Sequence, residues 1–460
     1  MKHFIKDIFS NDKRITEGHI VQNVVSLAAP LMIGALLQGS QSLVDMFWVG
    51  SLGPAAIAAV AMSGILMMLI FTIVAGIGMG TVSLVSKNIG AENAAGAQLC
   101  AYQTLILGFF LSIIGGLLGL FHAEKLLALL GANKEVIAAG TDYLRILLLG
   151  SFTMILLLLS SSILQGAGDV INPMIFMVIA NLLNIVLDPI FIFGIGVKPM
   201  HTAGAAVATV IAQGVSLFLS LRLFSHKRSK IRISFNKIRI RFEIMLDILK
   251  VGVPAMLQML FRSVMNMFIV SIVAGFGTAA LAAFGVVMRI HINALLPAFA
   301  LGGSAATLVG QNLGAGNIER ARESAWVATM INLILMFIAG LIFYYFSAPI
   351  MRLFTKDAEV IAIGSEFMRI SAFFYIFIAF GVVLNRALGG AGDTVVPMLI
   401  TFISLWGYLV PVAYFAAKYT RFGLAGVWWA VATSYALNGL LTLIWFEMGR
   451  WKKAKVNLYA

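Results

Sequence analysis

The chain has 460 residues, of which 61% are hydrophobic and only 11% charged, a composition that excludes an ordinary soluble domain and indicates many transmembrane helices. The net charge of +13 does not indicate nucleic-acid binding, because the basic residues gather in three short segments at the two ends and in the middle. By the positive-inside rule these segments lie in the cytoplasm. The single cysteine, Cys100, excludes an intramolecular disulfide, and no cleavable signal peptide is evident in the first twenty residues.

Twelve apolar segments are long enough to cross a bilayer core, which takes about 20 residues. Six lie before a basic linker, near residues 21–49, 55–82, 97–121, 137–164, 172–196 and 203–225. Six follow it, near residues 250–274, 279–308, 325–348, 362–388, 395–417 and 424–447. The pattern predicts an all-α integral membrane protein with these parts: N-terminal cytoplasmic segment 1–20, N-lobe 21–225, linker 226–246, C-lobe 247–447 and cytoplasmic tail 448–460.

The two halves of the chain are copies in one register, shifted by 224 residues, the separation of Pro30 and Pro254. The shift aligns "LVSKNIGAEN" (84–93) with "LVGQNLGAGN" (308–317), and "LQGAGDVINPM" (164–174) with "LGGAGDTVVPM" (388–398). Six spans per copy insert both copies in the same orientation, so we expect two six-helix lobes related by a parallel internal repeat. Some secondary transporters have this plan, with the substrate between or within the halves.

Most acidic residues lie in loops or at helix ends. Asp142 and Glu366 lie about one turn inside their spans, each three residues before an arginine, Arg145 and Arg369. This i,i+3 spacing puts both charges on one helix face. It predicts a structural ion pair near the membrane surface in each half.

Two carboxylates, Asp45 and Asp188, remain inside apolar spans, where a charged side chain costs about 2.5–3.5 kcal/mol on insertion scales. The second half has Ile269 and Val412 at these positions, so the fold itself does not require acids there. We therefore expect both acids to serve function, and function of this kind to be confined to the first half.

Both acids lie late in outward-running spans, and Thr209 lies early in an inward-running one, so all three are expected in the outer half of the membrane. Asn184 is one turn before Asp188 and shares its helix face. Two carboxylates, an amide oxygen and a hydroxyl form an all-oxygen set that suits a hard cation such as sodium. The carboxylates can instead share a proton. The sequence leaves both possibilities open.

Two prolines give these spans special backbone positions. Pro189 has no N–H, so the carbonyl of Ile185 loses its helical partner and is available to another donor or a cation. Pro30 offers a bend in the helix that carries Asp45. A simple packing kink explains each proline equally well.

The chain resembles a known family, the multidrug and toxic compound extrusion (MATE) transporters, and specifically its DinF-type branch. The resemblance rests on the paired six-span repeats, on "PLMIGALLQGSQSLVDMFWVG" (Pro30–Gly50), on the "QGAGD" and "GGAGD" turns, and on "NIVLDP" (Asn184–Pro189) and "GAAVAT" (Gly204–Thr209). It implies efflux of large, often cationic, amphipathic compounds driven by inward flow of sodium or protons.

The resemblance also assigns residues to roles. Asp45, Asn184, Asp188 and Thr209 match the cation-linked positions of the N-lobe, and Ala205 is expected to add a backbone oxygen. Gln38 and Gln41 match positions that line the substrate cavity there. Apart from the resemblance, the adaptable methionine side chain makes four methionines candidates for lining the cavity, with an ordinary core or lipid-facing role as the alternative: Met32, Met62, Met174 and Met177.

The chain departs from other branches of the family in its seventh and tenth spans, which contain no acid away from their ends. A second cation site in the C-lobe is therefore not expected. That lobe is instead expected to bury Arg262, Arg289 and His291, either along a pathway or in hydrogen bonds between the lobes.

The sequence thus predicts a cation-coupled antiporter that works by alternating access, a multi-pass monomer in the cell membrane. Small-molecule drugs, organic cations and membrane lipid are its expected partners, nucleic acid is not, and the coupling ion, sodium or a proton, replaces any cofactor. A flippase for lipid-linked precursors is the alternative, and it would favour a broad basic cavity over paired acids. An enzyme is not expected, because the six histidines are scattered and the cysteine stands alone.

Overall fold

The computed structural model describes residues 15–226, 229–233, 240–453 and 459, with the backbone alone at 40–43. Its described residues form helices and no strand. Ten helices are long and apolar enough to cross a membrane, or up to 12 if each of two bent pairs counts as one span. The prediction of an all-α membrane protein with twelve spans is confirmed.

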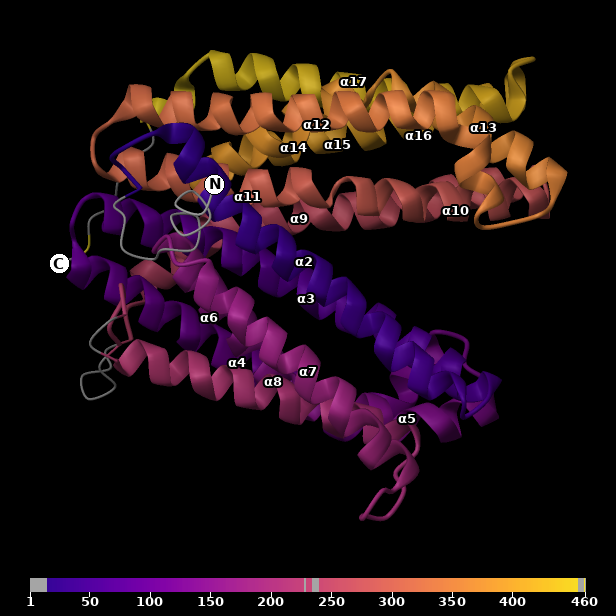
Figure 1. Cartoon of the computed structure of the whole chain (residues 1–460), viewed down its shortest axis with the longest axis horizontal. Helices are drawn as coiled ribbons and strands as arrows, with labels where there is room; N and C mark the ends of the chain where they lie inside the picture. Colours follow the sequence, from indigo (N-terminus) through magenta and orange to yellow (C-terminus); the bar gives the residue numbers. More distant parts are fainter. Residues whose placement is uncertain (1–14, 227–228, 234–239, 454–458, 460) are drawn as a thin grey trace, which may run out of the picture. The chain divides into compact units, whose positions relative to one another are not determined.

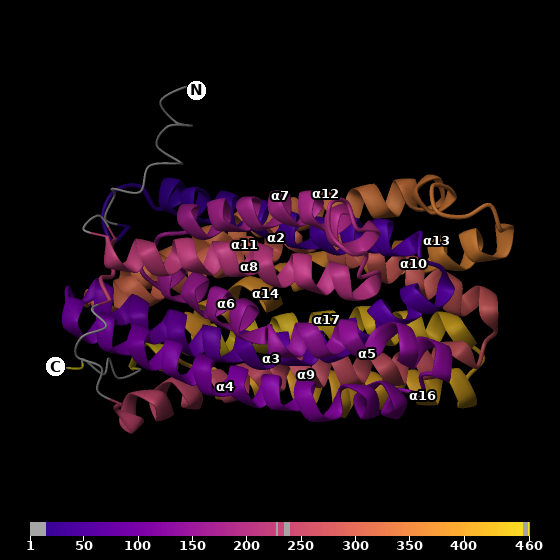
Figure 2. The ribbon, with the colours of Figure 1, turned by 90° about the horizontal axis from the view of Figure 1, so that it is seen from below.

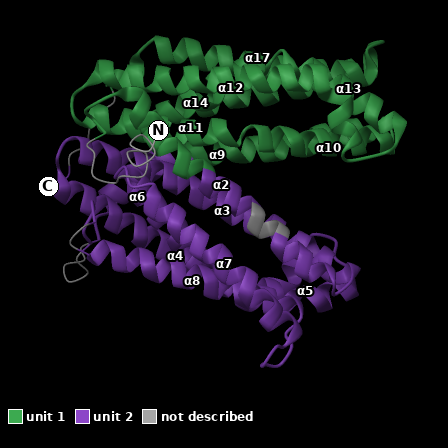
Figure 3. Cartoon of the chain, in the orientation of Figure 1, with its two compact units in different colours: residues 1–8, 13–32, 254–456 green, residues 9–12, 33–253, 457–460 purple. Residues whose placement is uncertain are grey.

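Two compact units divide the chain (Figure 3). Unit 2 contains residues 33–253, and unit 1 contains residues 13–32 and 254–456. Two long helices belong partly to each unit, α2 (Ile20–Gly50) and α9 (Phe242–Ala274). Helix α9 begins at Phe242, so the end of the predicted linker is already helical.

Most of the other helices of each unit run side by side along a common direction (Figures 1 and 2). Those of unit 2 are α3 (Pro54–Gly90), α4 (Ala94–Leu129), α5 (Lys134–Leu149), α6 (Ser151–Gly166), α7 (Ile171–Phe193) and α8 (Thr202–Ser225). Those of unit 1 are α10 (Thr278–Ala294), α11 (Leu296–Gly314), α12 (Ile318–Arg352), α13 (Ala358–Ala372), α14 (Tyr375–Gly390), α15 (Val395–Phe402), the π-helix η2 (Ile403–Leu409), α16 (Val410–Tyr419), α17 (Gly423–Glu447) and the 3₁₀ turn η3 (Arg450–Lys453).

One span in each unit is broken at the same point of the repeat. Helices α5 and α6 meet at 45°, and their counterparts α13 and α14 meet at 62°. The break in unit 2 falls at Gly150, where a Cβ would overlap the side chain of Val210. The repeat read from the sequence is therefore also present in the backbone.

Each unit has its own apolar core. In unit 1 the rings of Phe284, Phe367 and Trp428 stack, and the Phe367 and Trp428 centroids are 4.3 Å apart. In unit 2, Ile155 and Leu159 of α6 are fully buried among residues of α3 and α4. Two separate cores let each unit hold its own polar groups in place.

The two predicted ion pairs have different outcomes. Asp142 Oδ1 and Arg145 Nη1 lie 2.9 Å apart, which confirms the first pair. The second prediction is wrong, because Arg369 donates from Nε to Ser347 Oγ at 3.0 Å, and Glu366 has no ion-pair partner among the described residues. The kinked end of α12 brings Ser347 within reach of Arg369.

Candidate functional site

The polar face of α7 meets α8 in the interior of unit 2. Asn184 and Asp188 are both fully buried. Asn184 Nδ2 donates to Asp188 Oδ1 at 3.0 Å and to Thr209 Oγ1 of α8 at 3.3 Å. The close approach of the two helices depends on Gly204, because a Cβ there would lie 2.5 Å from the carbonyl of Phe191.

Asp45 reaches the same place from α2. Its carboxylate interacts with the side chains of Asp188 and Asn184. The end of α2 is held against unit 2 by Val49, which is fully buried, and by the Trp48 ring, whose centroid lies 6.0 Å from that of Phe193. The structure therefore brings together the four residues that the sequence linked to a cation.

Three oxygens of this group are buried without a hydrogen-bond partner among the described residues. They are Asp45 Oδ1, Asn184 Oδ1 and Asp188 Oδ2. The Asn184 amide has already given its donor atom to Asp188 and Thr209, and a carboxylate has only acceptors. Buried acceptors normally find a donor or an ion, so this cluster fits a small hard cation or a proton.

A cavity of about 180 Å³ opens beside the cluster. Asp45, Thr209 and Gln38 line it, together with Tyr143 and Gln213. Drug-sized ligands occupy sites of roughly 300–1,000 Å³, so this cavity is small for a drug and suited to water or a small ion. Because Asp45 is only half-buried and Asp188 is fully buried, an ion that enters here meets Asp45 first.

Tyr143 and Gln213 were not identified from the sequence. The buried Tyr143 interacts electrostatically with both Asp45 and Asp188. At the repeat shift its counterpart is Phe367, which lacks the hydroxyl, and the counterpart of Gln213 is Leu437. The comparison between halves that singled out the two acids would have found these residues too.

The second repeat closes the equivalent position. Tyr408, the counterpart of Asn184, lies with its hydroxyl 3.1 Å from Oγ1 of Thr433, the counterpart of Thr209. Ile269 and Val412 replace the acids. Nowhere in the described part of the chain do three or more His, Cys, Asp or Glu side chains gather as a metal site.

The remaining candidates lie outside the cluster or at its edge. Ala205 is buried one turn before Thr209. The Gln41 side chain lies outside the described part, although its backbone belongs to α2. Pro30 lies inside α2, and Pro189 lies inside α7, which continues unbroken through it.

None of the four predicted methionines lines the cavity, which has Met67 and Met154 instead. Met62 packs on a small apolar cluster around Leu127. Met177 is near α2, its sulfur 3.9 Å from where a Cβ on Gly34 would be, and Met32 and Met174 are part-exposed.

The basic residues of the second half are placed differently from one another. His291 is 4% exposed, with Nε2 unpartnered among the described residues, and its ring lies 5.9 Å from that of Phe343. Arg262 is half-buried near Tyr435 and Arg386. Arg289 is exposed, which corrects the expectation that it is buried.

The MatE family model matches the chain twice, over residues 30–190 and 254–415, so each match covers one repeat. The chain belongs to the MATE family. The expectation that it is a transporter and not an enzyme is confirmed by this membership. The assignment to the DinF-type branch stays a prediction.

Three bacterial relatives illustrate the similarity. "Probable multidrug resistance protein YpnP" of Bacillus subtilis is 30% identical over 96% of this chain and 98% of its own. "Probable multidrug resistance protein NorM" of Thermotoga maritima is 29% identical over 95% of this chain and 94% of its own. The "FAD transporter" of Shewanella oneidensis is 30% identical over 74% of this chain and 75% of its own.

Solved MATE structures share the fold at 28% identity. An outward-facing multidrug resistance MATE transporter matches with a TM-score of 0.88 over 96% of this chain and 99% of its own. A MATE structure in a bent conformation matches with a TM-score of 0.89 over 95% of this chain and 98% of its own, and one in a straight conformation with 0.88 over 96% and 99%. These similarities do not favour the lipid-linked flippase that the sequence left as an alternative.

Proposed function

We propose that this MATE protein is an antiporter that exports amphipathic, often cationic compounds by alternating access, driven by sodium or protons. Asp45, Asn184, Asp188 and Thr209 bind the coupling ion. The observation that carries the proposal is the set of three buried acceptor oxygens without a donor beside a small cavity. The multidrug names of two of the relatives support the class of substrate.

The arrangement of the site suggests how the ion acts. A cation that enters the cavity meets Asp45 and then bridges it to the buried Asp188, which relieves the repulsion between the two carboxylates. A proton on either carboxyl group has the same effect. Without the ion, α2 is free to adopt another bend at Pro30. The existence of bent and straight MATE structures supports such a two-state mechanism.

The binding of ion and drug is coupled if the ion favours one state of α2 and the drug favours the other. By linkage, each then weakens the binding of the other by the same factor, typically corresponding to about 1–3 kcal/mol. Gln38 and Asp45 line the same cavity, so binding of an ion at Asp45 changes the environment of Gln38 on α2. Titration of a fluorescent cationic substrate at rising sodium, and again at falling pH, measures this coupling.

The basic segments and the contacts of Tyr459 support the proposed membrane topology. In unit 2, Tyr459 near the C-terminus accepts a bond from Asn93 Nδ2 at 2.8 Å and donates its hydroxyl to Asp247 Oδ2 at 2.8 Å. These contacts support a C-terminal tail on the same side as the start of α9. With the positive-inside rule, we place both termini and the linker in the cytoplasm of a monomer in the cell membrane.

Transport into proteoliposomes tests the function, with sodium and proton gradients imposed separately. The panel contains a cationic dye and, because one relative is named an FAD transporter, FAD. Asp188→Asn should abolish gradient-driven transport, whereas the control Asp142→Asn, at an exposed ion pair, should transport normally. Wild-type transport rates in the Asp188→Asn protein would refute the assignment.

A further inference from the structure

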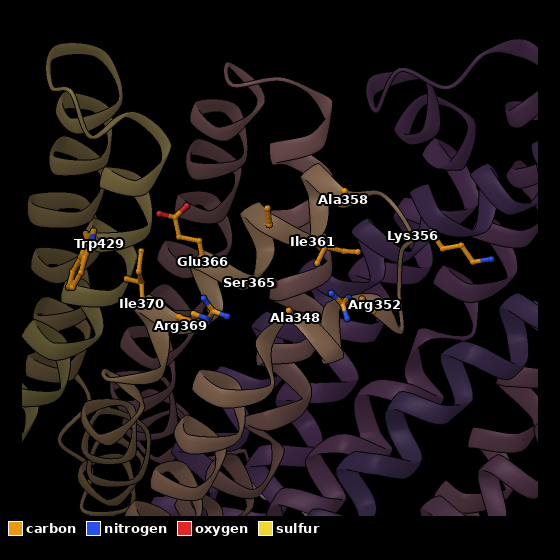
Figure 4. Close-up of a pocket in the computed structure, with 11 residues that line it drawn as sticks. Ala348, Arg352, Lys356, Ala358, Ile361, Ser365, Glu366, Arg369, Ile370 and Trp429 are labelled. Carbon is orange, nitrogen blue, oxygen red and sulfur yellow. The ribbon is translucent and has the colours of Figure 1, made fainter.

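A second pocket lies in unit 1, outside the site described above. Its volume is about 730 Å³, within the range of ligand sites. Helices α12, α13 and α17 and the connection between α12 and α13 form its walls (Figure 4). The basic side chains at its rim are Arg352, Lys356 and Arg369, and the only acid that lines it in the described residues is Glu366.

Two breaks in the helices create this pocket. Pro349 lies inside α12, and the backbone leaves helical geometry at Phe346, with φ −109° and ψ 16°. The last turn of α12, which carries Arg352, therefore departs from the direction of the helix. Helix α13 turns by 62° from α14 and carries Arg369 on its side of the pocket.

The positive charges of the pocket are not neutralised within the described part of the chain. Arg352 and Lys356 are exposed and have no ion-pair partner there. Arg369 uses Nε for the hydroxyl of Ser347 and has its other donors free of any described acid. In Figure 4 the Glu366 carboxylate turns away from the Arg369 guanidinium.

A buried hydroxyl gives a second, independent indication of a ligand. Ser365 lines the pocket, is only 6% exposed, and its Oγ has no hydrogen-bond partner among the described residues. A buried hydroxyl normally has a partner. Beside it, the indole of Trp429 is 47% exposed and offers an apolar face, together with Ile361.

The other repeat lacks these features. The counterparts of Arg352, Lys356 and Trp429 in unit 2 are all alanines, Ala128, Ala132 and Ala205. The counterpart of Arg369 is Arg145, which is held in an ion pair with Asp142. The fold thus does not require Arg352, Lys356 or the Trp429 indole, which argues for a role of these three residues in binding.

We propose that this pocket binds a phosphate group joined to an aromatic or acyl part, either on a free small molecule or as a phospholipid head group. Guanidinium groups match phosphate oxygens with two parallel hydrogen bonds, and lysine adds a point charge. Arg352, Arg369 and Lys356 hold the phosphate, the Ser365 hydroxyl donates to it, and Trp429 contacts the apolar part.

The test uses the full-length protein in dodecyl maltoside micelles, which contain no phosphate, with 1-naphthyl phosphate as the probe and its fluorescence anisotropy as the readout. We expect saturable binding, competition by inorganic phosphate, and no binding of 1-naphthol. Arg352→Gln and Arg369→Gln should each weaken binding about tenfold or more, because each removes a charge-assisted hydrogen bond to the phosphate. Arg145→Gln is the matched control and should bind the probe like wild type.

Two further arms complete the test. Phosphatidylglycerol added to the phosphate-free micelles identifies the source of the phosphate: competition with the probe supports a phospholipid head group, and no competition supports a free ligand. Asp188→Asn should bind the probe normally, because this site does not depend on ion coupling. If Arg369→Gln does not fold, Arg352→Gln decides, since the Arg352 side chain makes no hydrogen bond or ion pair within the described residues. Equal binding by Arg352→Gln and wild type, or equal binding of 1-naphthol, overturns the proposal.

Discussion

Asp188→Asn provides the sharpest test of the ion site, because it removes a charge and leaves the local hydrogen bond possible. An asparagine oxygen can still accept from Asn184, so we expect the ion-free protein to be as stable as wild type or more stable. What should disappear is the stabilisation by the ion. A buried acceptor without a donor costs about 1–3 kcal/mol of stability, and the site has three such oxygens. A bound ion can therefore regain roughly 3–9 kcal/mol, from which the cost of removing the ion's own water must be subtracted.

The lower end of this range corresponds to a Kd of several millimolar for sodium, since 1 mM is about −4.1 kcal/mol. Sodium at ten times that Kd should then stabilise the wild type by about 1.4 kcal/mol, from RT ln(1 + [L]/Kd). The assay is thermal unfolding of purified protein at rising sodium and, separately, at falling pH, with Asp142→Asn as the control. If wild type and Asp188→Asn respond alike to both ions, the reasoning fails.

Three other predictions follow from single positions. Gly204→Ala should destabilise the protein by about 1–3 kcal/mol, because the new Cβ meets backbone of α7, whereas Gly214→Ala in the same helix should be neutral or stabilising in the same unfolding assay. Burial raises the pKa of the Asp393 carboxyl, although the hydrogen bond from the Trp445 indole opposes this effect. The free energy of unfolding should therefore fall as the pH rises from about 4 through the raised pKa of the folded state. Asp393→Asn should flatten this pH dependence, and an unchanged slope would contradict the prediction. Pro30→Ala should slow transport while sodium-dependent stability persists; loss of both would show that Pro30 acts on the ion site itself.

Most of the fold was predictable because its determinants are local and repeated. The lengths of the apolar segments predict the twelve spans, and the shift of 224 residues aligns the two copies from the sequence alone. The helix boundaries moved by several residues where polar residues extend a helix beyond the membrane, as at Phe242 in α9. Such extensions depend on contacts with neighbouring helices, which hydropathy does not report.

The candidate site was predictable in its residues and not in its chemistry. The comparison of halves singled out Asp45 and Asp188, and helical spacing added Asn184. The sequence could not show that Asn184 directs its amide to Asp188 and Thr209 and so leaves three acceptors without donors. Nor could it show that Tyr143 of α5 lies near both acids, because that depends on how α5 packs against α2, α7 and α8.

The repeat itself explains why function divides between the halves. Each copy supplies the same helices, so a polar group that one copy has and the other lacks is not needed for folding. The first copy has Asp45 and Asp188 where the second has Ile269 and Val412, and the second has a Tyr408–Thr433 contact in place of Asn184 and Thr209. The second copy places Arg352 and Trp429 where the first has alanines. The two copies have the same fold, and each has a polar site at a place where the other has residues that serve packing alone.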